Sequence, residues 1–137
     1  MSDANKRLRQ LAGMDRFLAH IGAHWVDDPE GRVVLGLTVA QHHLNKHDTC
    51  HGGVIFALAD AAFGIASNAH EHVSLAIDAH ITFSAAVREG DAIKATVTEL
   101  TRTRRIGTYR VDVTKDGGEP VSQFTGTVYI TEKPVSV

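Results

Sequence analysis

The spacing of apolar residues along the chain predicts two helices and six strands. Near the N-terminus, apolar residues recur every three or four positions, which predicts an amphipathic helix that ends at Gly22. These apolar positions are Leu8, Leu11, Met14, Leu18 and Ile21. A longer helix is predicted from Gly52 to about Asn68, because its middle part is almost continuously apolar.

Alternation of apolar and polar residues predicts the strands. The clearest alternation covers residues 73–85, where every second residue is apolar: Val73, Leu75, Ile77, Ala79, Ile81, Phe83 and Ala85. Other strands are predicted at residues 23–26, 32–40, 92–101, 106–115 and about 120–131. An Asp-Gly pair within residues 115–118 predicts a hairpin turn, and residues 41–51 are expected to form an ordered loop.

One strongly apolar helix among six strands predicts an α+β fold. We expect a curved antiparallel sheet that wraps around the long central helix, with the other helix at the N-terminus. Such a sheet would cover most of the central helix, which explains why that helix is apolar on nearly all sides. The chain has 137 residues and no internal repeat or linker, so residues 1–137 are expected to form a single domain.

Composition and charge exclude several classes of protein. The chain is 43% hydrophobic and 22% charged, which is typical of a globular domain, and its net charge of −2 gives no indication of nucleic-acid binding. No apolar run approaches the roughly 18 residues that span a bilayer, and the first residues lack the apolar core of a signal peptide. The single cysteine, Cys50, suits a reducing compartment. We therefore expect a cytoplasmic protein without a membrane or nucleic-acid partner.

One acidic residue, Asp60, interrupts the apolar central helix. Burying an ionised carboxylate costs several kcal/mol unless it is paired or hydrogen-bonded. The residues one helical turn before and after Asp60 are apolar or glycine and offer no cation. Asp60 is therefore either a structural carboxylate that binds backbone groups or water, or a functional group that faces a cleft or another subunit.

The helix begins with the sequence His51-Gly52-Gly53. A helix start carries unpaired N–H groups, and two glycines allow a ligand carbonyl to reach them, as in an oxyanion hole; the alternative is a simple glycine turn. Gly53 and Asp60 are separated by about 10 Å along one helix, so they cannot both act on one carbonyl. Two antiparallel copies could, and we expect a twofold dimer in which Gly53 of one subunit faces Asp60 of the other.

The segment LNKHDTCHGGVIFALADAAFGIASNAH resembles the hotdog-fold acyl-CoA thioesterases of the PaaI type, which are linked to phenylacetate degradation. The resemblance extends from about Gly22 to Thr131. It is carried by an Asn, a His-Gly-Gly six residues later and an Asp nine residues after the His, and these residues are Asn45, His51, Gly52, Gly53 and Asp60. Some relatives have Thr or Ser one turn after the acid, where this chain has Phe63 and Gly64.

The resemblance implies hydrolysis of small acyl-CoA or aryl-CoA thioesters without a metal or cofactor. It suggests that the acyl group is of the phenylacetyl type or is a hydroxylated aryl group. It also implies a tetramer built from two dimers. Asp60 would act as the nucleophile or as the base that activates water, and the Gly53 N–H would polarise the thioester carbonyl. Asn45 would position water or the carboxylate, and His51 would bind the thioester or orient the loop. The alternative for Asn45 and His51 is hydrogen bonding within the loop or at the helix cap.

Further residues are candidates for binding the substrate. Gly52 allows close approach, and Phe63, with Phe56 and Phe83, would either line an aryl pocket or pack in the core. Coenzyme A carries several phosphates, so cationic residues are expected near the site. The candidates are Arg102, Arg104, Arg105 and, less directly, Arg88, and the alternative for each is a solvated strand end.

Three other readings of the sequence compete with this one. His43, His47 and His51 have a spacing of four that could bind zinc on a helix, and His70 and His72 follow, but the residues between the first three favour a loop, so no metal is expected. Cys50 could be a thiol nucleophile beside His51, but adjacent residues on an extended chain point apart, which favours an inert, buried cysteine. The last alternative is a non-catalytic acyl-CoA-binding regulatory module, and hotdog folds also serve dehydratases.

Overall fold

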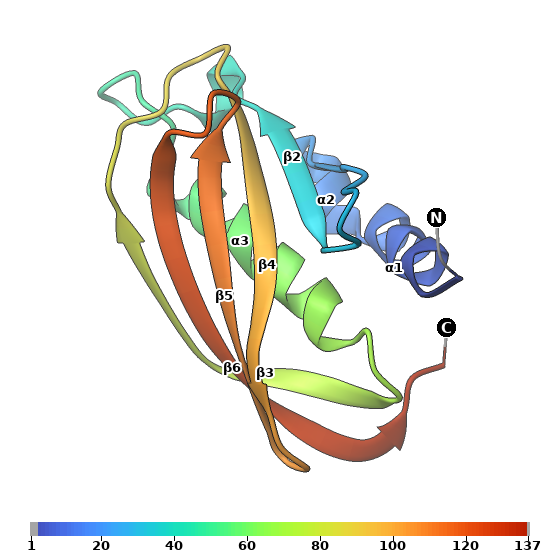
Figure 1. Cartoon of the computed structure of the whole chain (residues 1–137). Helices are drawn as coiled ribbons and strands as arrows, with labels where there is room; N and C mark the ends of the chain where they lie inside the picture. Colours follow the sequence, from blue (N-terminus) through green and yellow to red (C-terminus); the bar gives the residue numbers. More distant parts are fainter. Residues whose placement is uncertain (1–2, 137) are drawn as a thin grey trace.

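Within residues 3–136, which the computed structural model of the chain describes, six antiparallel strands form one sheet that curls around a central helix (Figure 1). The helix is α3 (Gly52–Ser67). The strand order across the sheet is β1 (His24–Trp25), β2 (Val34–Thr38), β4 (Ala92–Arg102), β5 (Ile106–Lys115), β6 (Pro120–Pro134) and β3 (His72–Phe83). This arrangement confirms the predicted α+β fold.

The N-terminal region forms two helices where the sequence predicted one. Helix α1 (Asp3–Met14) ends just before Asp15, and α2 (Arg16–Ile21) begins just after it. The Asp15 carboxylate Oδ1 accepts a hydrogen bond of 3.0 Å from the Leu18 N–H, so Asp15 is the N-cap of α2. The apolar spacing continues through both helices, which is why the break was not visible in it. Gly22 ends α2 in a left-handed conformation, with φ of 78°, as the sequence predicted.

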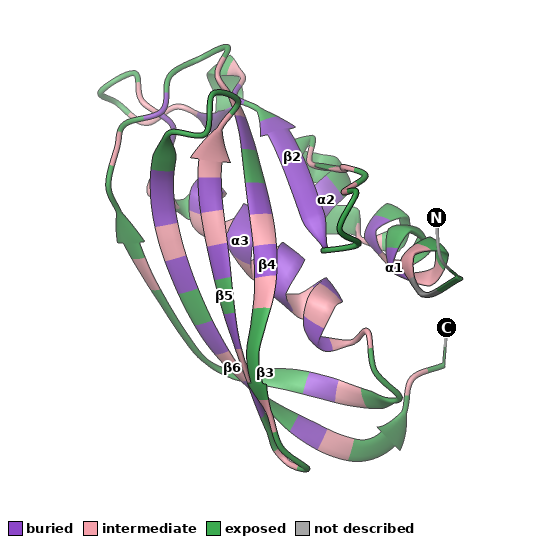
Figure 2. Ribbon diagram, viewed as in Figure 1, coloured by how far each residue is buried: buried purple, intermediate pink, exposed green. Residues whose placement is uncertain are grey.

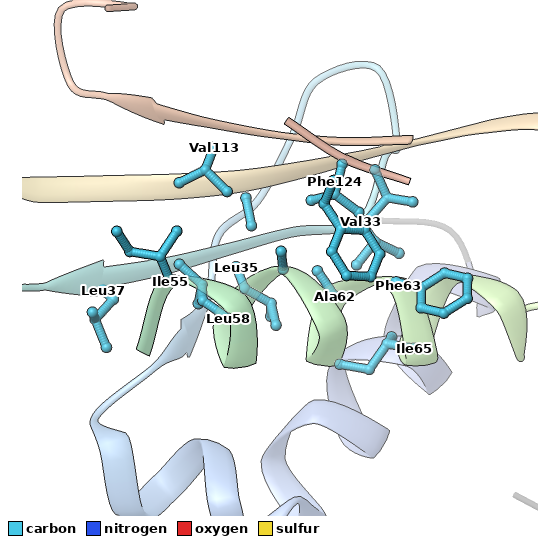
Figure 3. Close-up of a cluster of buried hydrophobic side chains, with 14 of the residues drawn as sticks. Val33, Leu35, Leu37, Ile55, Leu58, Ala62, Phe63, Ile65, Val113 and Phe124 are labelled. Carbon is cyan, nitrogen blue, oxygen red and sulfur yellow. The ribbon is translucent and has the colours of Figure 1, made fainter. Parts of the chain in front are cut away.

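The core lies between α3 and the concave side of the sheet (Figure 3). The Phe63 ring is fully buried and packs against Phe124 and Tyr109, with ring centroids 5.4 and 5.7 Å apart. Gly126 on β6 makes this contact possible, because a Cβ there would lie 2.6 Å from Phe63 Cζ. The large side chains of α3, with the fully buried Ala59 and Ala62 between them, therefore fix the helix on the sheet.

Strand β3 forms one edge of the sheet and is mostly exposed (Figure 2). A bulge at Ile77 shifts its register against β6, which changes the side to which the apolar residues point. Leu75, before the bulge, lies opposite the exposed Tyr129. Ile81, after the bulge, lies opposite the buried Phe124. The apolar alternation of this strand is thus divided between two faces, and Leu75 and Ile77 remain 55% and 60% exposed.

The connection between β2 and α3 is an ordered loop with a short 3₁₀ helix, η1 (Gln41–His43). Its Leu44 and Cys50 form an isolated antiparallel bridge, which brings the chain back to the start of α3. No helix in the described part of the chain is long and apolar enough to cross a membrane.

Candidate active site

Asp60, in the middle of α3, lines a cavity of about 460 Å³. The cavity lies between α3, the N-terminal helices, the start of β3 and the C-terminal end of the described chain. Its walls are mainly apolar, with Leu11, Ala61, Ile65 and Val73 among them. The acid therefore opens onto a space that a small acyl group could enter.

The Asp60 carboxylate is half-buried, and burial raises its pKa above the ordinary value. Within residues 3–136 it has no hydrogen-bond donor and no cation as a partner. A structural carboxylate is normally satisfied by such groups. Of the two readings of Asp60, the geometry favours the functional one.

At the start of α3, the His51 side chain caps the helix. Its Nδ1 atom accepts a hydrogen bond of 2.8 Å from the Gly53 N–H. In a neutral ring with this bond, the proton lies on Nε2, which faces outward as a donor. The Gly53 N–H, which the sequence suggested as the carbonyl donor, is thus occupied in the isolated chain. No acceptor in the described part of the chain takes the Gly52 N–H.

The Phe83 ring lies beside Gly52 at the same helix start. A Cβ on Gly52 would lie 3.1 Å from Phe83 Cζ, so a side chain here would press on the ring and shift it by a few tenths of an ångström. Phe83 is nevertheless 52% exposed and remains accessible to a ligand. Phe63, in contrast, is 0% exposed, so the expectation that it contacts substrate does not agree with its position in the core.

Asn45 organises the loop that precedes α3. Its Oδ1 accepts hydrogen bonds from the backbone N–H groups of His47 and Thr49, at 2.8 and 3.3 Å, and its Nδ2 donates to Thr49 Oγ1 at 3.0 Å. Asn45 and Arg88 line a second cavity of about 410 Å³, which does not include Asp60. Within one chain, the structure therefore brings Asn45 and Arg88 together and keeps both away from the acid.

The arginines near the β4–β5 turn gather as the sequence suggested. Arg102, Arg104 and Arg105 line one cavity of about 500 Å³. Glu132 partly neutralises this group, because it pairs with Arg105 at 2.7 Å and more loosely with Arg104 at 3.9 Å. Arg102 donates to the Tyr109 hydroxyl at 3.1 Å.

Arg102 also lines a polar cavity of about 750 Å³ together with Arg7, His70 and His72. Val135 lies in the wall of this cavity and in the wall of the Asp60 cavity, so the two are neighbours. Sequence reasoning did not identify Arg7, His70 or His72 as site residues. Arg7 lies in α1, far along the chain from His70 and His72, and no local motif links it to them.

A hydrogen-bonded network next to Arg102 was also missed. Glu99 accepts a bond of 2.8 Å from the Tyr109 hydroxyl and one of 2.7 Å from His70 Nε2. Burial opposes ionisation of Glu99, but the bonds from His70 and Tyr109 outweigh it and hold the Glu99 pKa below its ordinary value. Burial and the contact with Glu99 raise the Tyr109 pKa to about 12. The network fixes the end of β4 on which Arg102 lies.

Cys50 and the histidines have structural surroundings. Burial raises the pKa of the Cys50 thiol to about 11, so it remains protonated and a poor nucleophile at neutral pH. Both ring nitrogens of His43 are engaged, Nε2 with the Ile21 carbonyl at 2.7 Å and Nδ1 with the Ala40 N–H at 2.9 Å. Among the residues described, no group of three or more His, Cys, Asp or Glu side chains could hold a metal ion.

Comparison with known proteins identifies the family. A family model for the thioesterase superfamily matches residues 47–122, which include the helix start and Asp60. The chain belongs to the thioesterase superfamily. It is 31% identical over 106 residues to the acyl-coenzyme A thioesterase PaaI of Escherichia coli K12, a match that covers 77% of this chain and 76% of that protein.

Solved structures of other proteins agree with the fold. The structure of E. coli PaaI, from the phenylacetic acid degradation operon, superposes with a TM-score of 0.89 at 26% identity, covering 97% of this chain and 96% of PaaI. A Streptococcus mutans protein bound to acetyl-CoA superposes with a TM-score of 0.74 at 25% identity, covering 80% and 88%. The chain is therefore a hotdog-fold thioesterase of the PaaI type and a thioester hydrolase, as the motif suggested.

Proposed function

We propose that this thioesterase hydrolyses acyl-CoA to the free acid and CoA, and that its substrates carry small acyl or aryl groups of the phenylacetyl type. The observation that carries the proposal is the Asp60 carboxylate, which has no partner within residues 3–136 and opens onto a mainly apolar cavity. The similarity to the E. coli acyl-CoA thioesterase PaaI supports the reaction. The acetyl-CoA bound in the S. mutans structure supports recognition of the CoA part of the substrate.

Asp60 has one of two roles in the reaction, and both need its ionised form. As a nucleophile, a carboxylate oxygen attacks the thioester carbonyl carbon, the C–S bond breaks, and its electron pair leaves with the CoA thiolate. Water then hydrolyses the resulting anhydride. As a general base, Asp60 takes a proton from a water molecule that attacks the same carbon. Burial favours either role, because a raised pKa makes the carboxylate more basic.

The thioester carbonyl needs a hydrogen-bond donor that Asp60's own helix cannot supply at the required distance. We assign this donor to the start of α3 in a second subunit of a twofold dimer. The Gly52 N–H has no acceptor within the described chain, and the Gly53 N–H becomes available when the His51 ring turns away. The exposed edge of β3, with its apolar Leu75 and Ile77, supports pairing of two subunits along this strand.

The phosphates of CoA would contact the cluster of Arg102, Arg104 and Arg105, which neighbours the polar cavity beside the Asp60 site. Asn45, on the loop that leads to the helix start, would reach the substrate of the partner subunit, and so would Arg88, which lines the same cavity from the β3–β4 connection. Asn45 then holds that loop in shape, and Arg88 offers a further positive charge. Salt should weaken substrate binding if these contacts form.

We further propose a dimer of dimers in the cytoplasm, acting in phenylacetate degradation. The relation to PaaI supports the pathway, and the single buried Cys50 fits a reducing compartment. On the outer side of the sheet, Leu75, Tyr129 and Ile106 are consecutive cross-strand neighbours and are all exposed. This apolar row is suited to contact between two dimers.

The decisive experiment measures thiol release from a panel of acyl-CoAs by the wild type, Asp60→Asn and Asp60→Ala. We expect release by the wild type, greatest for aryl groups, and loss of about a thousandfold or more in both variants, which should still bind acyl-CoA. Asp116→Asn is a matched control in the exposed hairpin turn, where Asn-Gly serves as well as Asp-Gly. Binding of acyl-CoA without thiol release by the wild type would instead identify a regulatory binding module, and hydration of enoyl-CoA would identify a dehydratase.

A further inference from the structure

Two residues in the Asp60 cavity have no role in the chemistry proposed above, and local packing explains neither of them fully. Gly64 lies one helical turn after Asp60, and Asp15 lies between the two N-terminal helices. Both line the same cavity as the acid. An inference about them rests on the proposed function, because it takes this cavity as the place of the acyl group.

Gly64 lies in the interior of a helix, where glycine is less stable than alanine. Nothing in the described chain requires it there. A Cβ built on Gly64 would have no atom within 4 Å, and the residue is not in a left-handed conformation. In the same helix, by comparison, a Cβ on Gly52 would meet the Phe83 ring. The missing side chain at Gly64 therefore leaves space open directly beside the acid.

Asp15 brings a second carboxylate to the cavity. Its Oδ1 accepts the capping bond from Leu18, whereas Oδ2 has no partner within the described chain. No Lys, Arg or His is among the described residues that line the cavity, and its other walls are mainly apolar. An acyl group that carries its own negative charge would enter a space lined by two carboxylates and, among the described residues, by no cation; Arg7, outside this lining, donates to the Asn68 carbonyl at 3.0 Å.

We propose that the cavity beside Asp60 selects bulky, uncharged acyl groups, with Gly64 setting the size that it accepts and Asp15 excluding acyl groups that carry a carboxylate. Both are specificity-determining residues that do not take part in bond breaking. The substrate class is thus narrowed to neutral acyl-CoAs with a ring or branched chain near the thioester.

The size arm compares phenylacetyl-CoA with acetyl-CoA. In Gly64→Ala and Gly64→Ser, the ratio of kcat/KM for phenylacetyl-CoA to that for acetyl-CoA should fall about tenfold, which corresponds to the loss of one to two methylene contacts. Gly64→Ala should also melt at a higher temperature than the wild type. The matched control is Gly13→Ala in α1, where a Cβ likewise has no neighbour within 4 Å but the residue does not line the cavity. Equal loss on both substrates, or a changed oligomer, would mean that Gly64 serves helix packing between subunits and would overturn this arm.

The charge arm compares glutaryl-CoA with valeryl-CoA, which have the same number of carbons and differ by a terminal carboxylate in place of a methyl. Asp15→Asn keeps the cap, because asparagine caps helices as well as aspartate does, and removes the charge. The ratio of kcat/KM for glutaryl-CoA to that for valeryl-CoA should rise about three- to tenfold. Asp116→Asn, outside the cavity, should leave this ratio unchanged.

The outcomes separate this inference from the proposed function. If both ratios stay at the wild-type values while Asp60→Asn is inactive, the cavity is not the acyl site and the inference is wrong, but the thioesterase mechanism stands. If the wild type releases no thiol from any acyl-CoA, both fail. If either kcat/KM ratio changes in the stated direction while both control variants keep the wild-type ratio, the result supports the proposed specificity role of the residue that was substituted.

Discussion

At the scale of single residues, burial of Asp60 links catalysis to stability. Its pKa is raised in the folded chain by burial, whereas in the unfolded chain it is close to the ordinary value of about 3.9. Between these two values the folded protein binds more protons than the unfolded one. The free energy of unfolding therefore falls as the pH rises through this window, and the loss is complete above the raised pKa.

This linkage gives a stability prediction for Asp60→Asn, which cannot ionise. We expect the variant to melt at a higher temperature than the wild type at pH 7, although it is inactive. The difference should shrink as the pH falls and should disappear below about pH 4, where Asp60 is protonated in both states. Thermal unfolding of both proteins from pH 3.5 to 8 tests this. A wild type that is more stable than the variant at pH 7 would mean that Asp60 has a stabilising partner in the assembled protein.

A second prediction at this scale concerns Cys50. Because its thiol is buried and remains protonated, Cys50→Ala should keep kcat/KM within about twofold of the wild type. The substitution should lower the free energy of unfolding by about 1 kcal/mol, since a small buried group is removed. Thiol-release kinetics and urea unfolding measure the two effects. Loss of turnover in a folded Cys50→Ala would restore the thiol as a candidate nucleophile.

Residue chemistry was predictable from the sequence where a residue broke a local pattern. Asp60 was recognisable because it is the one charge in an apolar helix, and the glycines because they precede that helix. The sequence left capping of the helix by His51 open as an alternative role, and the structure agrees with it; that the His51 ring accepts the Gly53 N–H depends on a side-chain rotamer, which no sequence pattern records. Arg7 is brought to the polar cavity by tertiary packing alone, which periodicity does not record.

At the scale of secondary-structure elements, the contact between α3 and β6 depends on the absence of a side chain at Gly126. Phe63 is large and fully buried, and it fits only because Gly126 has no Cβ. The sequence showed an apolar helix and an apolar strand, but it did not show that a glycine on the strand and a ring on the helix are paired. Such complementary pairs depend on the register between strands. In β3 the bulge at Ile77 shifts this register against β6, and the apolar alternation does not reveal it.

The pairing predicts that Gly126→Ala is destabilising. The new methyl would lie 2.6 to 2.8 Å from the Phe63 ring atoms, so the ring or the strand must move. We expect the free energy of unfolding to fall by about 1–3 kcal/mol, measured by urea denaturation. Gly117→Ala is the matched control, because a Cβ there has no neighbour within 4 Å and should change the stability by no more than about 0.5 kcal/mol. If the two variants are equally stable, the contact between the ring and the glycine is not a constraint on the fold.

The bounds of the helices and strands were predicted more accurately than the side of each element on which its side chains are buried. The central helix and the strands of the second half were predicted nearly to their ends, because long apolar periodicity reflects burial directly. The N-terminal helix was predicted as one because an aspartate cap leaves the apolar spacing on either side intact.

At the scale of the whole molecule, the proposed site is shared between two subunits. If Asp60 of one subunit acts with the helix start of the other, two variants that are each inactive should complement each other in a mixed dimer. We expect Asp60→Asn and Gly53→Val to be inactive separately and to recover about a quarter of wild-type activity when they are unfolded and refolded together in equal amounts. This fraction follows because half of the dimers are mixed and each mixed dimer has one intact site of its two.

Each variant refolded alone is the control for this experiment, and size-exclusion chromatography confirms that both still assemble. Recovery well below a tenth, with mixed dimers present, would mean that each site is built within one chain. The subunit arrangement was predictable only as a geometric requirement of the helix length, since an isolated sequence contains no direct record of its partner.

The wall of the Asp60 cavity includes Val135 and Ser136, so the segment that follows β6 forms part of the proposed site. This position has a practical consequence for anyone who produces the protein. Under the proposed function, any bulk attached to this segment, such as a dye coupled to the thiol of Ser136→Cys, stands beside the acyl group and lowers the measured rate for large substrates more than for small ones. Labels and purification tags are therefore better placed away from this segment, or removed before kinetics.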